Sequence, residues 1–262
     1  MFASPGAVAI QLGPVEIRWY GLLIATAVLV GTLLAQTEAR RRGEDPEQLV
    51  NLAMIAIIAS LVGARLYYVL FNWDYYGSNP WKIVAVWEGG LAIHGGLIAG
   101  ILVGGFLAWR RNLPVFTYLD IVAPPLALGQ AIGRWGNFFN QEAFGTPTDL
   151  PWRLYISPSH RPPHLAEYEY FHPTFLYESM WDLAVFVLLF SVLRKRLQSY
   201  PGALFLSYLG LYSFGRFFVE GLRIDSLMLG PFRVAQVVSV LLILGAVGGL
   251  WWLLTHPSRG ST

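Results

Sequence analysis

The chain has 262 residues, of which 55% are hydrophobic and only 13% are charged. A soluble domain carries about 25% charged residues, so this apolar excess excludes an ordinary soluble protein with a single buried core. The net charge of +2 is too small to indicate a nucleic-acid partner, and the lack of cysteine excludes a disulfide, a thiolate metal site or a cysteine nucleophile from this chain. We therefore expect a membrane protein that forms one domain over residues 1–262.

Apolar runs that approach the length of about 20 residues needed to cross a bilayer occur in seven places. They lie near residues 19–34, 49–71, 91–109, 116–139, 174–193, 202–219 and 234–254. The fourth run is interrupted by Asp120, Pro124, Pro125, Gln130 and Arg134. A membrane helix tolerates such residues where it packs against protein. The sequence predicts an all-α integral membrane protein with seven transmembrane helices, the fourth inside the bundle.

Basic residues between the runs predict the orientation. Nine of them follow the first, third, fifth and seventh runs: Arg40, Arg41, Arg42, Arg110, Arg111, Arg194, Lys195, Arg196 and Arg259. The opposite connections hold six: Arg18, Lys82, Arg153, Arg161, Arg223 and Arg233. The positive-inside rule then places the N-terminus outside and the C-terminus in the cytoplasm. Residues 1–17 lack the features of a cleavable signal, so we expect the first helix to be retained.

Two connections on the outer side have distinctive compositions. Residues 140–172 are rich in proline and aromatic residues and predict a small extracytoplasmic head. Residues 72–90 contain Trp73, Trp81 and Trp87 together with two tyrosines, which suits a segment at the level of the lipid headgroups. We expect both segments to lie on the same side of the membrane.

On this topology, polar residues from separate helices fall at one outer level. They are Tyr20, Arg65, His94, Arg134, Asn137, His172, Glu178, Arg216 and Glu220. Charges inside spanning segments are rare and costly, and snorkelling alone would scatter basic side chains to both faces. We interpret the shared level as a functional site.

Two of these arginines, Arg134 and Arg216, indicate an anionic ligand at membrane depth. The abundant anion there is a lipid phosphate, whose geometry matches the planar guanidinium. Tyr212, Arg216 and Glu220 follow one another at steps of four, so Glu220 can orient Arg216 while Tyr212 offers a hydroxyl. An intramembrane ion pair that fixes helix packing is the alternative for Arg216.

The segment from Gly133 to Glu142 is dense in polar groups between glycines, which let a headgroup approach the backbone, and Asn137 can both donate and accept. An ordinary capped helix end is the alternative. His94 precedes two glycines and is a candidate general base if it faces the phosphate site, or a packing histidine otherwise. The spacing of His160 and His164 in a proline-rich loop does not predict a metal site.

Several motifs occur together in a fixed order. They are Arg18-Trp19-Tyr20-Gly21, His94-Gly95-Gly96-Leu97-Ile98, Gly133-Arg134-Trp135-Gly136-Asn137-Phe138-Phe139-Asn140-Gln141-Glu142 with Gly145, His172-Pro173-Thr174 with Leu176-Tyr177-Glu178, and Arg216-Phe217-Phe218-Val219-Glu220 with Arg223. On these motifs the chain resembles the prolipoprotein diacylglyceryl transferase family over nearly its whole length.

The resemblance implies a seven-helix, multi-pass enzyme of the bacterial plasma (inner) membrane with its active site on the extracytoplasmic side. It implies transfer of the diacylglyceryl group from phosphatidylglycerol to the lipobox cysteine of a preprolipoprotein, which forms a thioether and releases glycerol phosphate. The implied partners are phosphatidylglycerol, the preprolipoprotein and membrane lipid, with no nucleic acid, no metal and no cofactor. A chain without cysteine agrees with a thiol that comes from the substrate.

Within this chemistry we expect Arg134 to hold the phosphate and Arg216 to stabilise the charge on the leaving glycerol phosphate. His94 is the candidate base for the thiol, and an arginine that lowers the thiol pKa is the alternative. Besides Arg134, the residues expected to bind substrate are Tyr20, Asn137, Glu142, Gly145, Tyr212, Glu220 and Arg223.

Two other classes of protein remain open from the residues alone. A transporter for anionic lipid would also need buried arginines, but transporters usually show internal repeats and helices broken near the midplane. A structural membrane subunit would explain the helices but not the shared level of the polar residues. Both are weaker predictions than an enzyme.

Overall fold

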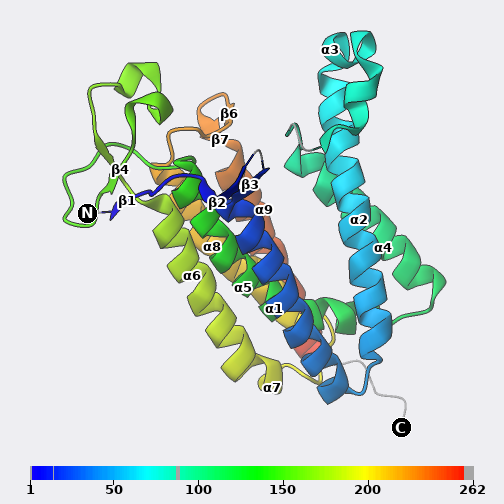
Figure 1. Ribbon diagram of the computed structural model, residues 1–262. Coiled ribbons are helices and arrows are strands. Elements are labelled where there is room, and N and C mark those ends of the chain that lie inside the picture. The colour runs from blue at the N-terminus through cyan, green and yellow to red at the C-terminus, as the bar shows by residue number, and fades with distance from the viewer. Residues whose placement is uncertain (1, 14, 87–88, 257–262) are drawn as a thin grey trace. The chain divides into compact units, whose positions relative to one another are not determined.

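The computed structural model describes residues 2–13, 15–86 and 89–256, so Trp87 and Arg259 of the predictions above lie outside the described residues. A helix occupies each of the seven predicted segments: α1 (Trp19–Arg42), α2 (Pro46–Phe71), α4 (Ile93–Arg110), α5 (Val115–Asn140), α6 (Thr174–Leu188), α8 (Ala203–Leu222) and α9 (Val234–Thr255) (Figure 1). The chain contacts divide into two compact units, Met1–Leu34 with Leu119–Thr262, and Ala35–Tyr118. The expectation of one domain stays a prediction.

Six of the described helices are long and apolar enough to cross a membrane. The fifth of these runs over Thr174–Arg196, because the π-helical turn η5 (Leu189–Leu193) and α7 (Arg194–Arg196) continue α6. Helix α8 is not among the six, since serines, tyrosines, Arg216 and Glu220 lower its mean hydropathy. These six candidate spans, identified by length and composition, agree with the predicted all-α multi-pass membrane protein, while a seventh span stays a prediction.

In the unit Ala35–Tyr118, glycines allow α2 and α4 to pack closely. A Cβ atom at Gly63 would overlap Ala99 and the backbone of Gly95, and a Cβ atom at Gly100 would overlap Ser60. Small residues at such contacts let helix backbones approach and gain van der Waals packing, which drives helix association in lipid.

Arg65 of α2 holds the connection that contains α3 (Trp73–Ser78) and η1 (Pro80–Val84). Its five N–H groups donate to five backbone carbonyls, those of Lys82 (2.6 Å), Ile83 (2.8 Å), Ala85 (3.3 Å), Gly89 (2.5 Å) and Gly90 (2.9 Å). An arginine has five N–H donors, so none remains for a ligand. The interpretation that Arg65 belongs to the functional site is therefore corrected, because its role is to order this connection.

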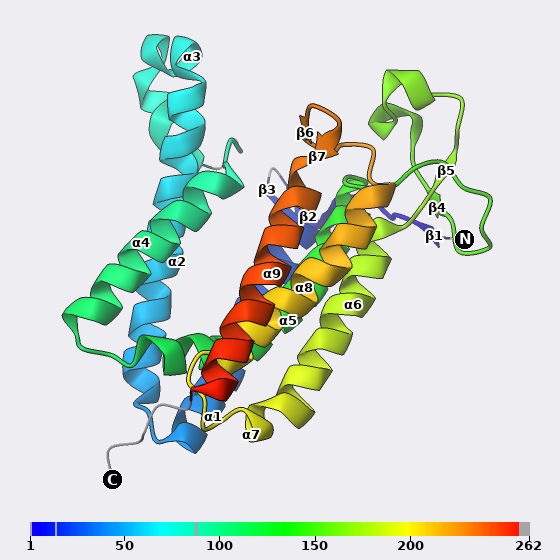
Figure 2. The same ribbon diagram turned by 180° about the vertical axis from the view of Figure 1, so that it is seen from behind.

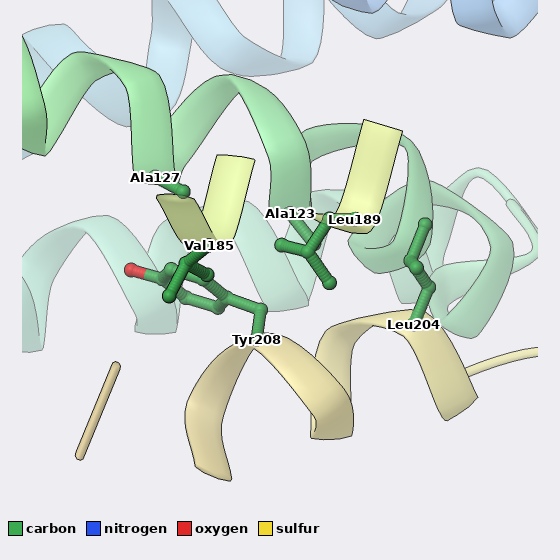
Figure 3. Close-up of a cluster of buried hydrophobic side chains, with 6 residues drawn as sticks. All are labelled: Ala123, Ala127, Val185, Leu189, Leu204 and Tyr208. Atoms are coloured by element: carbon green, nitrogen blue, oxygen red, sulfur yellow. The ribbon is translucent and has the colours of Figure 1, made fainter. Parts of the chain in front are cut away.

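In the other unit, α5, α6, α8 and α9 run alongside one another, as two opposite views show (Figure 2). Helix α5 is the most buried of the six spans, and Pro124 and Pro125 lie inside it without ending it. The prediction that the fourth run lies inside a helix bundle is confirmed within this unit. Figure 3 shows a core cluster formed by α5, α6, η5 and α8. Its buried members are Ala123, Ala127, Val185, Leu189, Leu204 and Tyr208.

Asp120 explains how a fully buried charge can stand in an apolar run. Its carboxylate accepts hydrogen bonds from the backbone N–H groups of Gly202 (3.0 Å) and Phe205 (2.9 Å) at the start of α8. The first N–H groups of a helix have no partner within the helix, and the helix dipole favours a negative charge there. Asp120 of α5 thus caps α8 and fixes the two helices together.

Short strands occur in the N-terminal segment and in the connections. The sheet β1-β4-β5 comprises β1 (Phe2–Ala3), β4 (Leu154–Tyr155) and β5 (Tyr170–Phe171), with β1 parallel and β5 antiparallel to β4. The hairpins are β2 (Val8–Leu12) with β3 (Val15–Arg18), and β6 (Met228–Leu229) with β7 (Phe232–Arg233).

The segment 141–173 between α5 and α6, which we call the head, contains β4, β5 and the short helices η3 (Pro158–His160) and η4 (Pro163–Leu165). A hydrophobic core joins the head to the ends of α5 and α6, through Phe138, Phe144, Leu154, Ile156, Phe171 and Phe175.

Candidate functional site

Charged side chains meet where the C-terminal end of α5, the N-terminal end of α6 and the C-terminal end of α8 come together. Glu178 of α6 forms ion pairs with Arg134 of α5 and with Arg216 of α8. Arg216 uses its second terminal nitrogen for an ion pair with Glu220 one turn further along α8. One carboxylate therefore fixes two arginines from different helices in one place.

Arg223 adjoins this group at the end of α8. Its guanidinium lies 4.0 Å from Glu178 and donates to both carboxylate oxygens of Asp225, at 2.9 and 2.7 Å. We call Arg134, Glu178, Arg216, Glu220 and Arg223 the arginine cluster. The cations are more accessible than the anions: 21%, 17% and 13% of the arginine side chains, in sequence order, are exposed, against 6% and 3% for the two glutamates.

The spacing of α8 produces one half of the cluster. Arg216 and Glu220 are four residues apart and lie on one helix face, as the sequence predicted. Tyr212 lies one turn before Arg216, and its ring stacks on that of Tyr208 at 6.0 Å between centroids. The Tyr208 hydroxyl donates to Gln130 of α5 at 2.9 Å. The predicted spacing of Tyr212, Arg216 and Glu220 is thus present on α8, and Tyr208, which stacks on Tyr212, contacts α5.

Glycine at position 136 brings the start of α1 against the end of α5. A Cβ atom there would overlap the ring of Tyr20. The neighbouring rings of Trp19 and Phe139 stack at 4.6 Å between centroids with an interplanar angle of 13°. Two motifs that are far apart in the sequence are therefore adjacent, which places Tyr20 beside the helix that carries Arg134.

The loop after α5 presents Glu142 toward the end of that helix. Glu142 accepts hydrogen bonds from the side-chain amides of Asn137 (3.0 Å) and Asn140 (3.3 Å). Gln141 and Ala143 on either side of it have φ angles of +53° and +56°, which side-chain-bearing residues seldom adopt. Such strain is retained where the surroundings fix the backbone, and it gathers at functional sites. Asn137 and Glu142, both predicted to bind substrate, thus form one hydrogen-bonded group.

Gly145 crosses the end of α8. Its backbone forms an isolated antiparallel bridge with Arg223, and its N–H donates to the carbonyl of His172 at 3.0 Å. A Cβ atom would come within 2.8 Å of the His172 Cβ and 3.1 Å of the Leu222 carbonyl oxygen, so glycine is required for this close approach. Gly145 therefore sets the backbone position of Arg223.

His172, at the base of the head, belongs to a chain of polar contacts. Trp152 Nε1 donates to the Tyr177 hydroxyl at 2.9 Å, and that hydroxyl lies 3.2 Å from His172 Nδ1. Burial lowers the pKa of His172 from its ordinary value of 6.5. The imidazole is therefore neutral near pH 7, and its Nδ1 shares a hydrogen bond with the Tyr177 hydroxyl.

Comparison with known proteins shows the family of the chain. Residues 7–252 match the model of the family described as prolipoprotein diacylglyceryl transferase. The chain belongs to this family. Relatives named phosphatidylglycerol–prolipoprotein diacylglyceryl transferase include that of Trichormus variabilis, 54% identical over 97% of this chain and 91% of the relative, and that of Thermosynechococcus vestitus, 52% identical over 96% and 94%. That of Gloeobacter violaceus is 49% identical over 98% of this chain and 96% of the relative.

In this family member the predicted residues divide between the two units. The unit that carries the head contains most of them, namely Tyr20, Asn137, Glu142, Gly145, Tyr212, Glu220 and the three arginines of the cluster. His94 lies in the unit Ala35–Tyr118, where it is the exposed second residue of α4 and has its ring centroid 6.1 Å from that of Tyr67. Its role as a base stays a prediction.

Glu178 is the residue whose importance sequence reasoning did not recognise. It was noted as a charge near the start of the fifth run, yet it is the carboxylate that connects Arg134 with Arg216. A carboxylate within an apolar run needs a cationic partner, and two other runs of this chain each contain an arginine, Arg134 and Arg216. That signal predicts an ion pair for Glu178, but it does not say which arginine is the partner.

Proposed function

We propose that this chain transfers the diacylglyceryl group of phosphatidylglycerol to the lipobox cysteine thiol of a preprolipoprotein. Membership of the prolipoprotein diacylglyceryl transferase family and the names of relatives at about 50% identity support this reaction. The structural observation that carries the proposal is the arginine cluster, in which the three arginine side chains are partly exposed while the side chains of Glu178 and Glu220 are almost fully buried.

The cluster is suited to a lipid phosphate. Arginine N–H groups bind phosphate in a planar, charge-assisted geometry, and the ion pairs to Glu178 hold Arg134 and Arg216 in place before a ligand arrives. Donors fixed in advance need little reorganisation as charge develops on a leaving group. Arg134 then binds the phosphate, Arg216 stabilises the departing glycerol phosphate, and Glu220 keeps Arg216 oriented.

The transfer forms one bond and breaks one bond. The thiolate sulfur attacks the lipid glycerol carbon that bears the phosphate ester, so that a C–S bond forms while the C–O bond to phosphate breaks and its electron pair leaves with glycerol phosphate. The thiol proton goes to a base, for which His94 is our candidate. The headgroup or the peptide is positioned by the other predicted binding residues, namely Tyr20, Tyr212, Arg223, Gly145 and the pair Asn137–Glu142.

For the membrane, we propose seven spans with α8 included, the N-terminus outside and the C-terminus in the cytoplasm of a bacterium, in its plasma membrane. The polar residues of α8 are compatible with spanning, because Ser207, Tyr208, Ser213 and Glu220 are buried against protein. The head and the arginine cluster, at one end of the helices of their unit, then face the extracytoplasmic side.

The activity test uses phosphatidylglycerol labelled in its headgroup phosphate and a lipobox peptide that carries either cysteine or serine. We expect release of labelled glycerol phosphate with the cysteine peptide, and a loss of about 10²- to 10³-fold on Arg134→Ala. Arg161→Ala is the matched control, since Arg161 bonds to carbonyls within the head, those of Ile156 and Ala166. Lipid binding without release for any peptide would instead support a transporter.

The base assignment is tested by replacing each of two histidines. His94→Gln is expected to lower turnover, most strongly at neutral pH where a thiol is mostly protonated. His172→Gln is the comparison variant, because its Nδ1 is already occupied by Tyr177. Turnover of His94→Gln near the level of the unchanged protein would move the activation of the thiol to an arginine.

The orientation can be measured cleanly because the chain has no cysteine. A single cysteine at Ser159, in the head, should react with a membrane-impermeant maleimide added outside intact cells. A single cysteine at Lys195, in α7, should react after the membrane is opened. The reverse pattern would overturn the proposed orientation.

A further inference from the structure

Asp182 is a buried carboxyl group that the proposed reaction does not use. It lies on α6 one turn after Glu178, and 2% of the residue is exposed. Its Oδ2 atom is fully buried and has no hydrogen-bond partner among the described residues. Glu220 is equally buried, at 2%, but it is paired with Arg216. Two carboxyl groups of equal burial in one region thus differ in whether a cation neutralises them.

The groups that face Asp182 come from three helices. Arg134 of α5, Glu178 of α6 and Arg216 of α8 are the charged groups close enough to act on it. Tyr208 and Tyr212 of α8 also lie near Asp182, and the Tyr208 hydroxyl donates to Gln130 of α5. Asp182 therefore lies in the seam between α5, α6 and α8, directly beside the arginine cluster.

The cations near Asp182 are already matched by other carboxylates. Arg134 pairs with Glu178, Arg216 with Glu178 and Glu220, and Arg223 with Asp225. No described cation forms an ion pair with Asp182. An unpaired buried carboxylate with an unsatisfied oxygen is strongly unfavourable, whereas a neutral carboxylic acid costs far less to bury. One further negative charge here would also repel an anion from the arginines.

We propose that Asp182 is a positioning residue that stays protonated in the working protein, and that its neutrality keeps the arginine cluster able to bind an anionic phosphate. The first half depends on the burial and pairing of Asp182 alone. The second half rests on the proposed function of the cluster. If Asp182 ionised, its carboxylate would compete with phosphate for the nearby guanidinium groups of Arg134 and Arg216.

Infrared difference spectroscopy tests the first half without any reference to activity. A protonated carboxylic acid shows a carbonyl stretch that an ionised carboxylate lacks. The spectrum of the unchanged protein minus that of Asp182→Asn at neutral pH should contain this acid band. Glu220→Gln is the control, because Glu220 is paired with Arg216 and its removal should take away no acid band. A difference spectrum for Asp182→Asn without the acid band would overturn the proposal.

The band can also be followed in the unchanged protein alone as the pH is raised, so the test does not depend on how well a variant folds. We expect the acid band to persist at neutral pH and to disappear in alkaline solution. A band that is absent at neutral pH contradicts the proposal even if Asp182→Asn cannot be purified.

Lipid binding tests the second half. Binding to phosphatidylcholine vesicles that contain phosphatidylglycerol is measured without peptide from about pH 6 to about pH 9. Over the range where the acid band disappears, affinity of the unchanged protein should fall roughly tenfold or more, while that of Asp182→Asn stays level. If the affinities of the two proteins changed with pH in the same way, the proposal that neutral Asp182 favours phosphate binding would be overturned. An acid band with no lipid binding in either protein would reject the proposed function but leave the protonation of Asp182 standing.

Discussion

Arg65 and Arg216 are two intramembrane arginines that the sequence presents in the same way and the structure uses differently. Arg65, in the unit Ala35–Tyr118, directs all five donors to backbone carbonyls of the connection after α2. Arg216, in the unit that carries the head, divides its terminal nitrogens between Glu178 and Glu220. The two residues thus differ in the kind of partner, which is a backbone carbonyl for Arg65 and a carboxylate for Arg216.

The difference shows which buried arginines can take part in binding. A guanidinium saturated by carbonyls has its donors fixed within the fold, so it stabilises a local structure. A guanidinium held by carboxylates is oriented by charge and can exchange a carboxylate for another anion, since both are acceptors of charge-assisted hydrogen bonds. The same substitution, arginine to lysine, should therefore affect stability in one region and activity in the other.

The largest effect is expected for Arg65→Lys, on stability. Lysine has three donors on a flexible stem, so at least two of the five hydrogen bonds to carbonyls are lost. At about 1.5–3 kcal/mol for each hydrogen bond to a charged group, unfolding should become easier by about 3 kcal/mol or more. Thermal unfolding in detergent measures this. Unchanged stability would show that the positive charge alone holds the connection.

Next in size is Arg216→Lys, on activity. A single ammonium group cannot reproduce the fork that contacts Glu178 and Glu220 at once, and it offers phosphate a point charge instead of a planar pair of donors. Turnover of phosphatidylglycerol should fall roughly 10- to 100-fold while the melting temperature changes little. A variant with normal turnover and lowered stability would assign Arg216 the same structural role as Arg65.

Much of this arrangement follows from local sequence. The apolar runs predicted where the seven helices lie, and a spacing of four predicted that Arg216 and Glu220 share a face. What local pattern could not predict is pairing between helices. Glu178 and Arg216 form an ion pair although they are 38 residues apart in the sequence. Asp120 binds the N–H of Gly202, which is 82 residues further along the chain. Each polar residue needs a partner, but the sequence does not name it.

Arg65 was misinterpreted for the same reason. Its depth in the second run resembles that of a site residue, and the carbonyls that use its donors come from an irregular connection without a sequence pattern. Conversely, Asp120 was noted as an interruption of the fourth run, and its role as a cap depends on where α8 begins. In both cases the partner is a backbone group, which leaves no mark in the sequence.

Asp120→Asn extends the comparison to a carboxylate whose partners are also backbone groups. Asparagine keeps one acceptor oxygen, but its amide group then faces the N–H of Gly202 or Phe205. We expect a loss of about 1–2 kcal/mol in unfolding free energy, in the range of a lost helix cap. Asp149→Asn in the exposed part of the head is the control and should leave thermal unfolding unchanged. Equal effects of the two substitutions would argue against the capping role.

The smallest effect concerns His172, a titratable group beside the backbone bridge of Gly145 and Arg223. Burial lowers its pKa below 6.5, so the unfolded chain takes up a proton at a higher pH than the folded chain does. Stability should therefore rise with pH through this window and fall as the pH drops below about 6.5. His172→Gln, which cannot be protonated, should show a flatter decline between about pH 7 and about pH 5 when thermal unfolding is measured in detergent. Identical pH dependence in the two proteins would mean that His172 has the same pKa in the folded and the unfolded chain, so that burial at the base of the head does not lower it.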